Sequence, residues 1–112
     1  MAEADVKKEI NKVLRKFGVY TFMPVPGGYG KGGVHDHIVC YMGFFISIEA
    51  KADAKKEPSG LQIKNAREII AAGGCALLIH DENIHEVTRA LESLDARVRP
   101  VSVWPDLINE VV

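Results

Sequence analysis

The sequence has no long hydrophobic run, few cysteines and almost no net charge. No apolar stretch approaches the roughly 20 residues of a membrane-spanning helix, and the N-terminus (MAEADVKKEI) is charged rather than signal-like, so we expect a cytoplasmic protein. Cys40 and Cys75 lie in apolar runs without metal-binding spacing, which favours small buried thiols over a zinc site or a disulfide. A net charge of -1 excludes a histone-like polybasic surface, so any nucleic-acid contact must come from a local patch.

The length of 112 residues allows one hydrophobic core, and we therefore expect a single domain over 1–112. Apolar residues make up 47% of the chain and charged residues 26%, a balance typical of globular proteins rather than disordered ones.

The first expected element is an amphipathic helix over 4–17 that ends at Gly18. Its apolar face consists of Val6, Ile10, Val13, Leu14 and Phe17. The other face is basic, with Lys7, Lys8, Lys12, Arg15 and Lys16. Such a stripe is either a solvated surface, the more common case, or a phosphate-facing one.

The rest of the chain predicts alternating strands and helices. A strand over 19–23 is followed by a glycine-rich loop, and a hairpin joins strands over 35–41 and 44–51 through Met42-Gly43. Ser59 is the expected cap of a helix over 60–72, followed by a buried strand over 75–80, a helix over 81–94, a weaker strand over 97–103 and a short helix from Pro105. This order predicts an α/β domain with a central mixed sheet flanked by helices, an αβββαβ core.

The second hairpin strand carries the candidate chemistry. Residues alternate between the two faces of a strand, so Glu49 and Lys51 lie on the face opposite Phe44, Ile46, Ile48 and Ala50, which we expect to be core. Asp36 on the partner strand is close to them in some registers. Two carboxylates held together repel each other and therefore attract a divalent cation or share a proton. Mg²⁺ bound by one or two carboxylates keeps waters that it supplies to a phosphate, and a neighbouring lysine stabilises the charge that develops.

The segments Gly33-Val34-His35-Asp36, 43–51 (GFFISIEAK), Ser59-Gly60-Leu61-Gln62 and 72–76 (AGGCA) resemble the PD-(D/E)xK nuclease superfamily, and within it the virus-type replication-repair (VRR-NUC) nucleases. The resemblance covers roughly 9–94 and implies a restriction-endonuclease-like fold. It implies that Asp36, Glu49 and the Ala50 carbonyl bind Mg²⁺ or Mn²⁺, that Lys51 is the catalytic lysine and that Gln62 lies near the site. The family usually has proline where this chain has His35. Relatives often carry a further acidic residue on the first helix, which corresponds to Glu9, although a glutamate beside lysines is more often surface charge.

Several other polar residues allow two interpretations. Gln62 lies on the helix face that we expect to be turned toward the sheet. It is either a cap at the start of the helix or, as we favour, part of the site. His35 and His37 are expected on the face opposite Asp36, as surface or interface residues rather than ligands. The expected DNA contacts come from the glycine-rich loop and from the lysines that follow the catalytic strand, namely Tyr29, Lys31, Lys55, Lys56 and Lys64.

These observations predict a divalent-metal-dependent endodeoxyribonuclease. The resemblance further implies a homodimer that acts on branched DNA such as Holliday junctions or flaps, and it is compatible with a viral, phage or bacterial origin. The apolar C-terminus, 101–112 with Trp104, also favours a dimer, since a chain of this length does not readily bury it alone. The alternatives are a catalytically inactive nucleic-acid-binding module of the same fold and a structural subunit whose C-terminus docks a partner.

Overall fold

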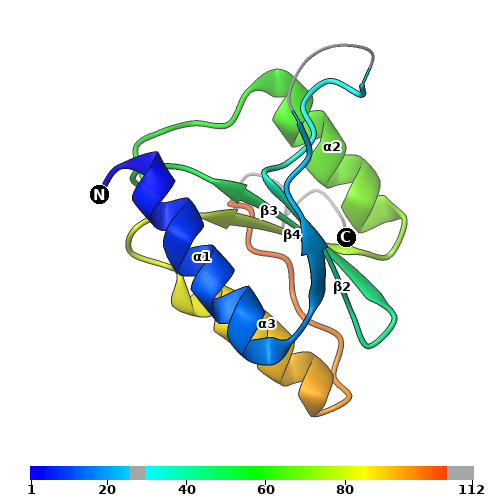
Figure 1. Ribbon diagram of the computed structural model, residues 1–112. Helices are drawn as coiled ribbons and strands as arrows, with labels where there is room; N and C mark the ends of the chain where they lie inside the picture. Colours follow the sequence, from blue (N-terminus) through cyan, green and yellow to red (C-terminus); the bar gives the residue numbers. More distant parts are fainter. Residues whose placement is uncertain (26–29, 106–112) are drawn as a thin grey trace.

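The computed structural model describes residues 1–25 and 30–105, which form one α/β domain (Figure 1). Its elements, in chain order, are α1 (Glu3–Phe17), β1 (Tyr20–Phe22), β2 (His37–Tyr41), β3 (Phe44–Ala50), α2 (Gly60–Ala71), β4 (Cys75–Ile79) and α3 (His85–Asp95). In the described part of the chain, no helix is both long and apolar enough to cross a bilayer.

The four strands form one mixed sheet in the order β1-β2-β3-β4. β1 and β2 pair antiparallel, as do β2 and β3, whereas β4 lies parallel to β3 after the crossover through α2. Helices α1 and α3 lie side by side on one face of the sheet, and α2 covers the other face (Figure 1). The predicted αβββαβ core, with its mixed sheet flanked by helices, is confirmed.

Local sequence explains where these elements begin and end. Val6, Ile10 and Leu14 are the buried stripe of α1, and the helix ends at Gly18, whose φ of 67° is a left-handed conformation that favours glycine. The β2–β3 turn places both Met42 and Gly43 at positive φ, the geometry of the tight hairpin turns that match strand twist.

Two hydrophobic cores lie on opposite faces of the sheet. The larger one packs the apolar stripes of α1 and α3 against β2, β3 and β4. The smaller one lies under α2 and contains Ala66, Ala76 and Trp104. Trp104 is fully buried within its own chain, so the expectation that it contributes an exposed dimer surface is wrong. Residues 106–112, which belonged to that expectation, lie outside the described residues.

The structure corrects several other expectations. The strand expected over 97–103 is reduced to a single bridge between Leu77 and Val103. α3 begins at His85 instead of 81, because the Asn83 side chain bonds to the backbone of Leu78 and His80 and forms a turn there. Cys75 is buried as predicted, but Cys40 is exposed because it lies on a part of the sheet that α2 does not cover.

Candidate active site

The candidate site lies where β2 begins and β3 ends. Asp36 immediately precedes β2, and its Oδ2 accepts a hydrogen bond from the backbone N–H of Ala50 at 2.9 Å. This bond brings the Asp36 carboxylate to the last residues of β3, beside Glu49. The two carboxylates, predicted to converge from neighbouring strands, therefore lie at the same end of the sheet.

Glu49 is held in an unusual state for a carboxylate. Only 3% of the residue is exposed, because α2 covers its face of β3. Burial, together with the Asp36 charge, raises the pKa of Glu49 to about 8. Its Oε1 is buried without a hydrogen-bond partner among the described residues. A buried carboxylate of this kind favours either a proton or a cation.

Lys51 is the cation that the site already contains. Its Nζ lies 3.4 Å from Glu49 Oε2 and donates a hydrogen bond to Gln62 Oε1 at 3.1 Å. The backbone N–H of Lys51 donates to the carbonyl of Ile79, which extends the β3–β4 pairing one residue beyond β3 and fixes where the side chain starts. The Lys51 side chain is thus held both at its backbone and at its ammonium group.

Gln62 is both a helix cap and a contact of the site side chains, the two interpretations that the sequence left open. It forms a capping box with Ser59, since Gln62 N–H donates to Ser59 Oγ and Gln62 Oε1 accepts from Ser59 N–H. The same side chain donates from Nε2 to Glu49 Oε2 at 3.1 Å and accepts from Lys51. One amide therefore joins the first turn of α2 to Glu49 on β3 and to Lys51, the residue that follows β3.

Lys7 is a site residue that the sequence reasoning placed only in a surface stripe. Its Nζ lies 3.4 Å from Asp36 Oδ1 and 3.4 Å from Glu3 Oε2. Glu9, the residue implied by the resemblance, instead pairs with Lys12 at 3.0 Å. Which residue of α1 reaches the site depends on how the helix rotates about its axis when it packs, and helical spacing does not settle that rotation.

His35 and His37 are buried, so the expectation of surface residues is wrong. They also lie on different faces. His35 stacks on Trp104 under α2 and hydrogen-bonds Ser47 Oγ and the Gln62 carbonyl. His37 is in register with Ile48, a residue of the larger core, and neither of its ring nitrogens has a partner among the described residues. Strand alternation fails at His35 because β2 begins only at His37.

A cleft of about 640 Å³ opens in front of Asp36 and Gln62. One wall is the end of the glycine-rich loop, which lies against the start of α2. Asn65 donates from Nδ2 to the carbonyls of Gly32 and Leu61, holding this wall in place. Gly33 has a φ of 74°, and a Cβ there would come within 2.5 Å of the Leu61 backbone.

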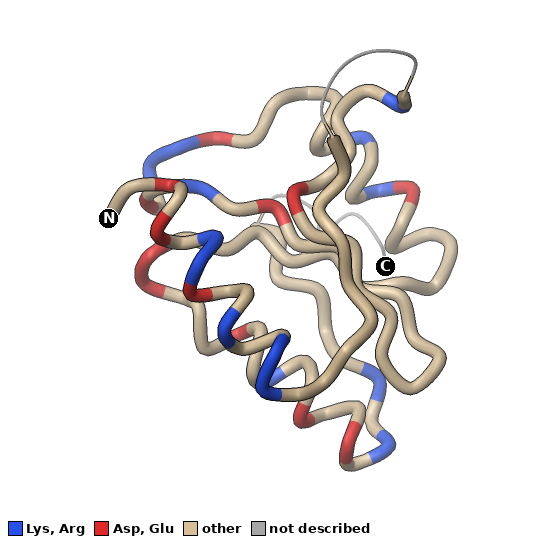
Figure 2. The backbone as a smooth tube through the Cα atoms, viewed as in Figure 1, with Lys and Arg blue, Asp and Glu red and all other residues tan. Residues whose placement is uncertain are grey.

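Of the described residues expected to contact DNA, Lys31 lines this cleft and Lys55, Lys56 and Lys64 do not. Lys31 pairs with Glu68 at 2.8 Å. Lys55 and Lys56 are exposed in the loop between β3 and α2, where Figure 2 shows a basic stretch followed by an acidic one, and Lys64 is exposed on α2. Tyr29 lies outside the described residues.

The donor set fits a hard divalent ion with few protein ligands. Among residues 1–25 and 30–105, no group of three or more histidine, cysteine or acidic side chains could hold a metal, so Asp36 and Glu49 form a pair without a third such ligand. Mg²⁺ is often held by one or two carboxylates and keeps its waters. The unpartnered Glu49 Oε1 provides a free oxygen for such an ion.

The order and topology of the elements are those of a restriction-endonuclease-like α/β domain. A solved structure described as a VRR_NUC domain has the same fold, with a TM-score of 0.66 and 18% sequence identity over 82% of this chain and 96% of that chain. The resemblance seen in the sequence is thereby confirmed at the level of the fold. No family model and no curated protein sequence matches the chain.

Proposed function

We propose that the protein is a divalent-metal-dependent endodeoxyribonuclease. The observation that carries the proposal is the convergence of Asp36 and Glu49, with Lys51 3.4 Å from the Glu49 carboxylate, at the edge of an open cleft. Burying a carboxylate beside another one destabilises the fold, and perturbed groups of this kind concentrate at active sites. The shared fold with a VRR_NUC domain supports the same conclusion.

In this proposal Asp36, Glu49 and the Ala50 carbonyl hold Mg²⁺ or Mn²⁺. When bound there, the ion would supply Lewis acidity and would lower the pKa of a water, both of which favour attack on a phosphodiester. The Asp36 side chain is fixed for this role by the Ala50 N–H, and Lys7 balances its charge before the ion binds.

Lys51 stabilises the negative charge that develops on the phosphoryl oxygens. Its ammonium is preorganised by Gln62 and Glu49, so little reorganisation is needed when charge develops. Gln62 contacts the two catalytic side chains simultaneously and is a positioning residue. Lys31, Lys55, Lys56 and Lys64, with Tyr29, supply the contacts to DNA. Glu9 of α1 contributes to the metal site only if it leaves Lys12.

The test is a cleavage assay on linear, flap and four-way-junction DNA with Mg²⁺, Mn²⁺ or Ca²⁺. We expect Lys51→Gln to lower the rate by about 10²- to 10³-fold, the usual effect of removing one preorganised electrostatic contact. Lys16→Gln is the matched control, because it removes the same charge from an exposed position on α1 and should leave the rate unchanged.

Equal rates for the Lys51 variant and wild type would contradict the assignment. Absence of cutting in every metal, with DNA binding that persists in EDTA, would instead identify the inactive binding module. The preference for branched DNA and the homodimer rest on the resemblance to the VRR-NUC nucleases. Comparing the three DNA substrates tests the preference, and sedimentation equilibrium of the full chain tests the dimer.

A further inference from the structure

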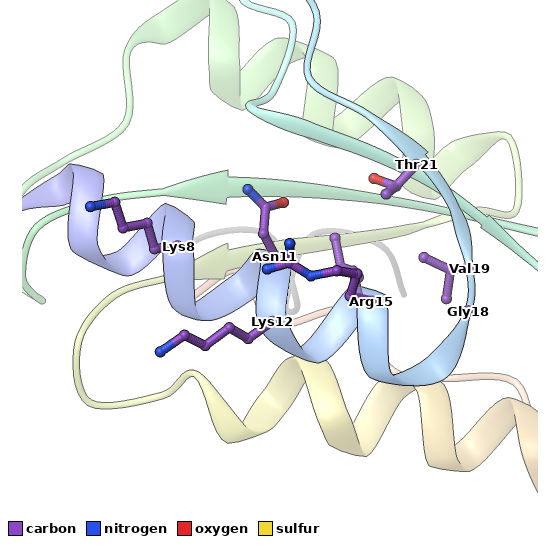
Figure 3. A pocket seen from close by; sticks show the side chains of 8 residues that line it. Lys8, Asn11, Lys12, Arg15, Gly18, Val19 and Thr21 are labelled. Atoms are coloured by element: carbon purple, nitrogen blue, oxygen red, sulfur yellow. The ribbon is translucent and has the colours of Figure 1, made fainter.

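A second concave surface lies beside the candidate site, between α1 and β1 (Figure 3). It has a volume of about 550 Å³, and its polar lining comes from Lys8, Asn11, Lys12 and Arg15 of α1 and Thr21 of β1. We call this surface the α1–β1 groove. None of the residues assigned above to metal, catalysis or DNA contact lines it.

The lining of the groove is cationic without compensating acids. Three of its residues are basic, and none of the described lining residues is acidic. Lys12 pairs with Glu9, which lies outside the lining, whereas Lys8 and Arg15 have no ion-pair partner among the described residues. Figure 3 shows the Arg15 side chain extending back along α1 toward Asn11, with Thr21 across from them. This charge distribution suits a polyanion.

The groove adjoins the active-site cleft. Asn11, in the groove, contacts the sulfur of Met23 through Nδ2 at 3.7 Å, and Met23 lines the cleft. Lys7, one residue before Lys8, also lines the cleft and lies 3.4 Å from Asp36. A chain of phosphates that leaves the cleft over Met23 would therefore enter the groove beside Asn11.

The spacing of the cations matches a phosphate backbone. Lys8, Lys12 and Arg15 are four and three residues apart and so lie on one face of α1. At 1.5 Å per residue they span about 10 Å, which equals the axial rise of roughly three nucleotides in one strand of a duplex.

We propose that the α1–β1 groove binds the phosphate backbone of the substrate strand where it leaves the active-site cleft. This inference rests on the proposed nuclease function and extends it, because it names the path of the substrate. Contacts of this kind add affinity and register without sequence preference. The groove therefore recognises a strand long enough to reach it, and not a free phosphate.

The test compares single-stranded oligonucleotides of 4 and 12 nucleotides, measured by fluorescence anisotropy with Ca²⁺ and again with EDTA. We expect the double variant Lys8→Gln/Arg15→Gln to bind the 12-mer about tenfold more weakly near 0.1 M salt. Its plot of log affinity against log salt should be flatter by about 1.4, since each phosphate contact on a single strand contributes about 0.7. Binding of the 4-mer, which fills only the cleft, should not change.

The matched control is Lys16→Gln/Arg89→Gln, which removes the same charge from two exposed residues outside the groove. We expect it to change 12-mer binding by less than twofold. Equal losses in the two double variants would overturn the proposal. An equal loss for the 4-mer, with competition by millimolar inorganic phosphate, would also overturn it and identify a free-anion pocket.

The outcomes separate this proposal from the nuclease assignment. If Lys51→Gln abolishes cutting while the groove variant binds the 12-mer like wild type, the nuclease assignment is supported and the groove is not. If no metal supports cutting but the 12-mer still depends on Lys8 and Arg15, the groove is a nucleic-acid site on a protein that is not a nuclease.

Discussion

At the residue scale, the raised pKa of Glu49 links proton binding to metal binding. Its pKa of about 8 means that the metal-free protein holds a proton on this carboxylate at neutral pH. A cation must displace that proton, so metal binding and proton release are coupled. The carboxylate that would bind the ion is thus in competition with solvent protons throughout the neutral range.

We therefore predict that the apparent Mg²⁺ affinity rises about tenfold per pH unit between pH 6 and 8 and then levels off. Isothermal titration calorimetry in buffers of different ionisation enthalpy measures both the affinity and the released proton. Glu49→Gln keeps the shape of the side chain and should abolish binding. An affinity that does not change with pH would show that Glu49 is ionised before the metal arrives.

The placement of single residues was predictable from sequence where the strand or helix period decides which face a side chain takes. Alternation along β3 placed Glu49 and Lys51 on one face, and the helix period turned Gln62 toward them. Lys7 was not predictable, because its contact with Asp36 depends on how α1 packs on the sheet. The burial of His35 likewise depends on Trp104, which is about 70 residues away in the sequence.

At the scale of elements, the contact between the glycine-rich loop and α2 sets the position of the site glutamine. Gly33 approaches the Leu61 backbone so closely that only a hydrogen atom fits at its Cα. Leu61 immediately precedes Gln62, so the position of the loop and that of the site glutamine are set together.

We predict that Gly33→Ala lowers the free energy of unfolding by about 2 kcal/mol or more, because the methyl group clashes with backbone and the φ is unfavourable. It should also reduce cleavage, since α2 must shift and carry Gln62 away from Lys51. Gly43→Ala is the control, because Gly43 has a similar φ of 77° but nothing within 4 Å of a Cβ.

Urea denaturation and the cleavage rate are the two measurements. The control should lose about 1 kcal/mol of stability for its backbone conformation and keep its activity. If both variants lose the same stability and neither loses activity, the contact with α2 does not position the site.

Element boundaries were predictable where a local signal exists. Gly18, the Met42-Gly43 turn and the Ser59 cap each mark a boundary that the structure confirms. The strand expected over 97–103 failed because the segment is irregular, with Val98 and Val101 exposed and only Val103 bridged to β4. No short-range pattern distinguishes those two outcomes.

At the scale of the whole molecule, buried titratable groups make stability depend on pH in two opposing ways. Burial lowers the pKa of His37 to about 4, so an unfolded chain binds a proton that the folded chain rejects between pH 6.5 and 4. Stability from this residue is complete above pH 6.5 and is lost as the pH falls toward 4. Glu49 acts oppositely, because the folded chain holds its proton up to about pH 8 and stability falls as the pH rises.

We predict that His37→Leu becomes more stable than wild type as the pH falls, gaining up to about 3 kcal/mol between pH 7 and 4. The variant removes two buried nitrogens without partners, and Glu49 is present in both proteins, so its contribution cancels in the difference. Chemical denaturation of both proteins at several pH values gives this difference. A constant difference would show that the pKa of His37 is the same in the folded and the unfolded chain.

The fold of the whole chain was predictable because the order of its elements permits few arrangements of a mixed sheet with a crossover helix. The exposure of Cys40 and the burial of Trp104 were not, because both depend on how far α2 and the C-terminal segment extend over the sheet.

The stacking of Trp104 on His35 gives the molecule an internal optical reporter. Trp104 is the single tryptophan of the chain, and the imidazole beneath it is hydrogen-bonded to the carbonyl of Gln62. Any event that moves the start of α2 changes the quenching of that indole. Ion or substrate binding that moves the start of α2 would therefore change the intrinsic fluorescence of the unlabelled protein.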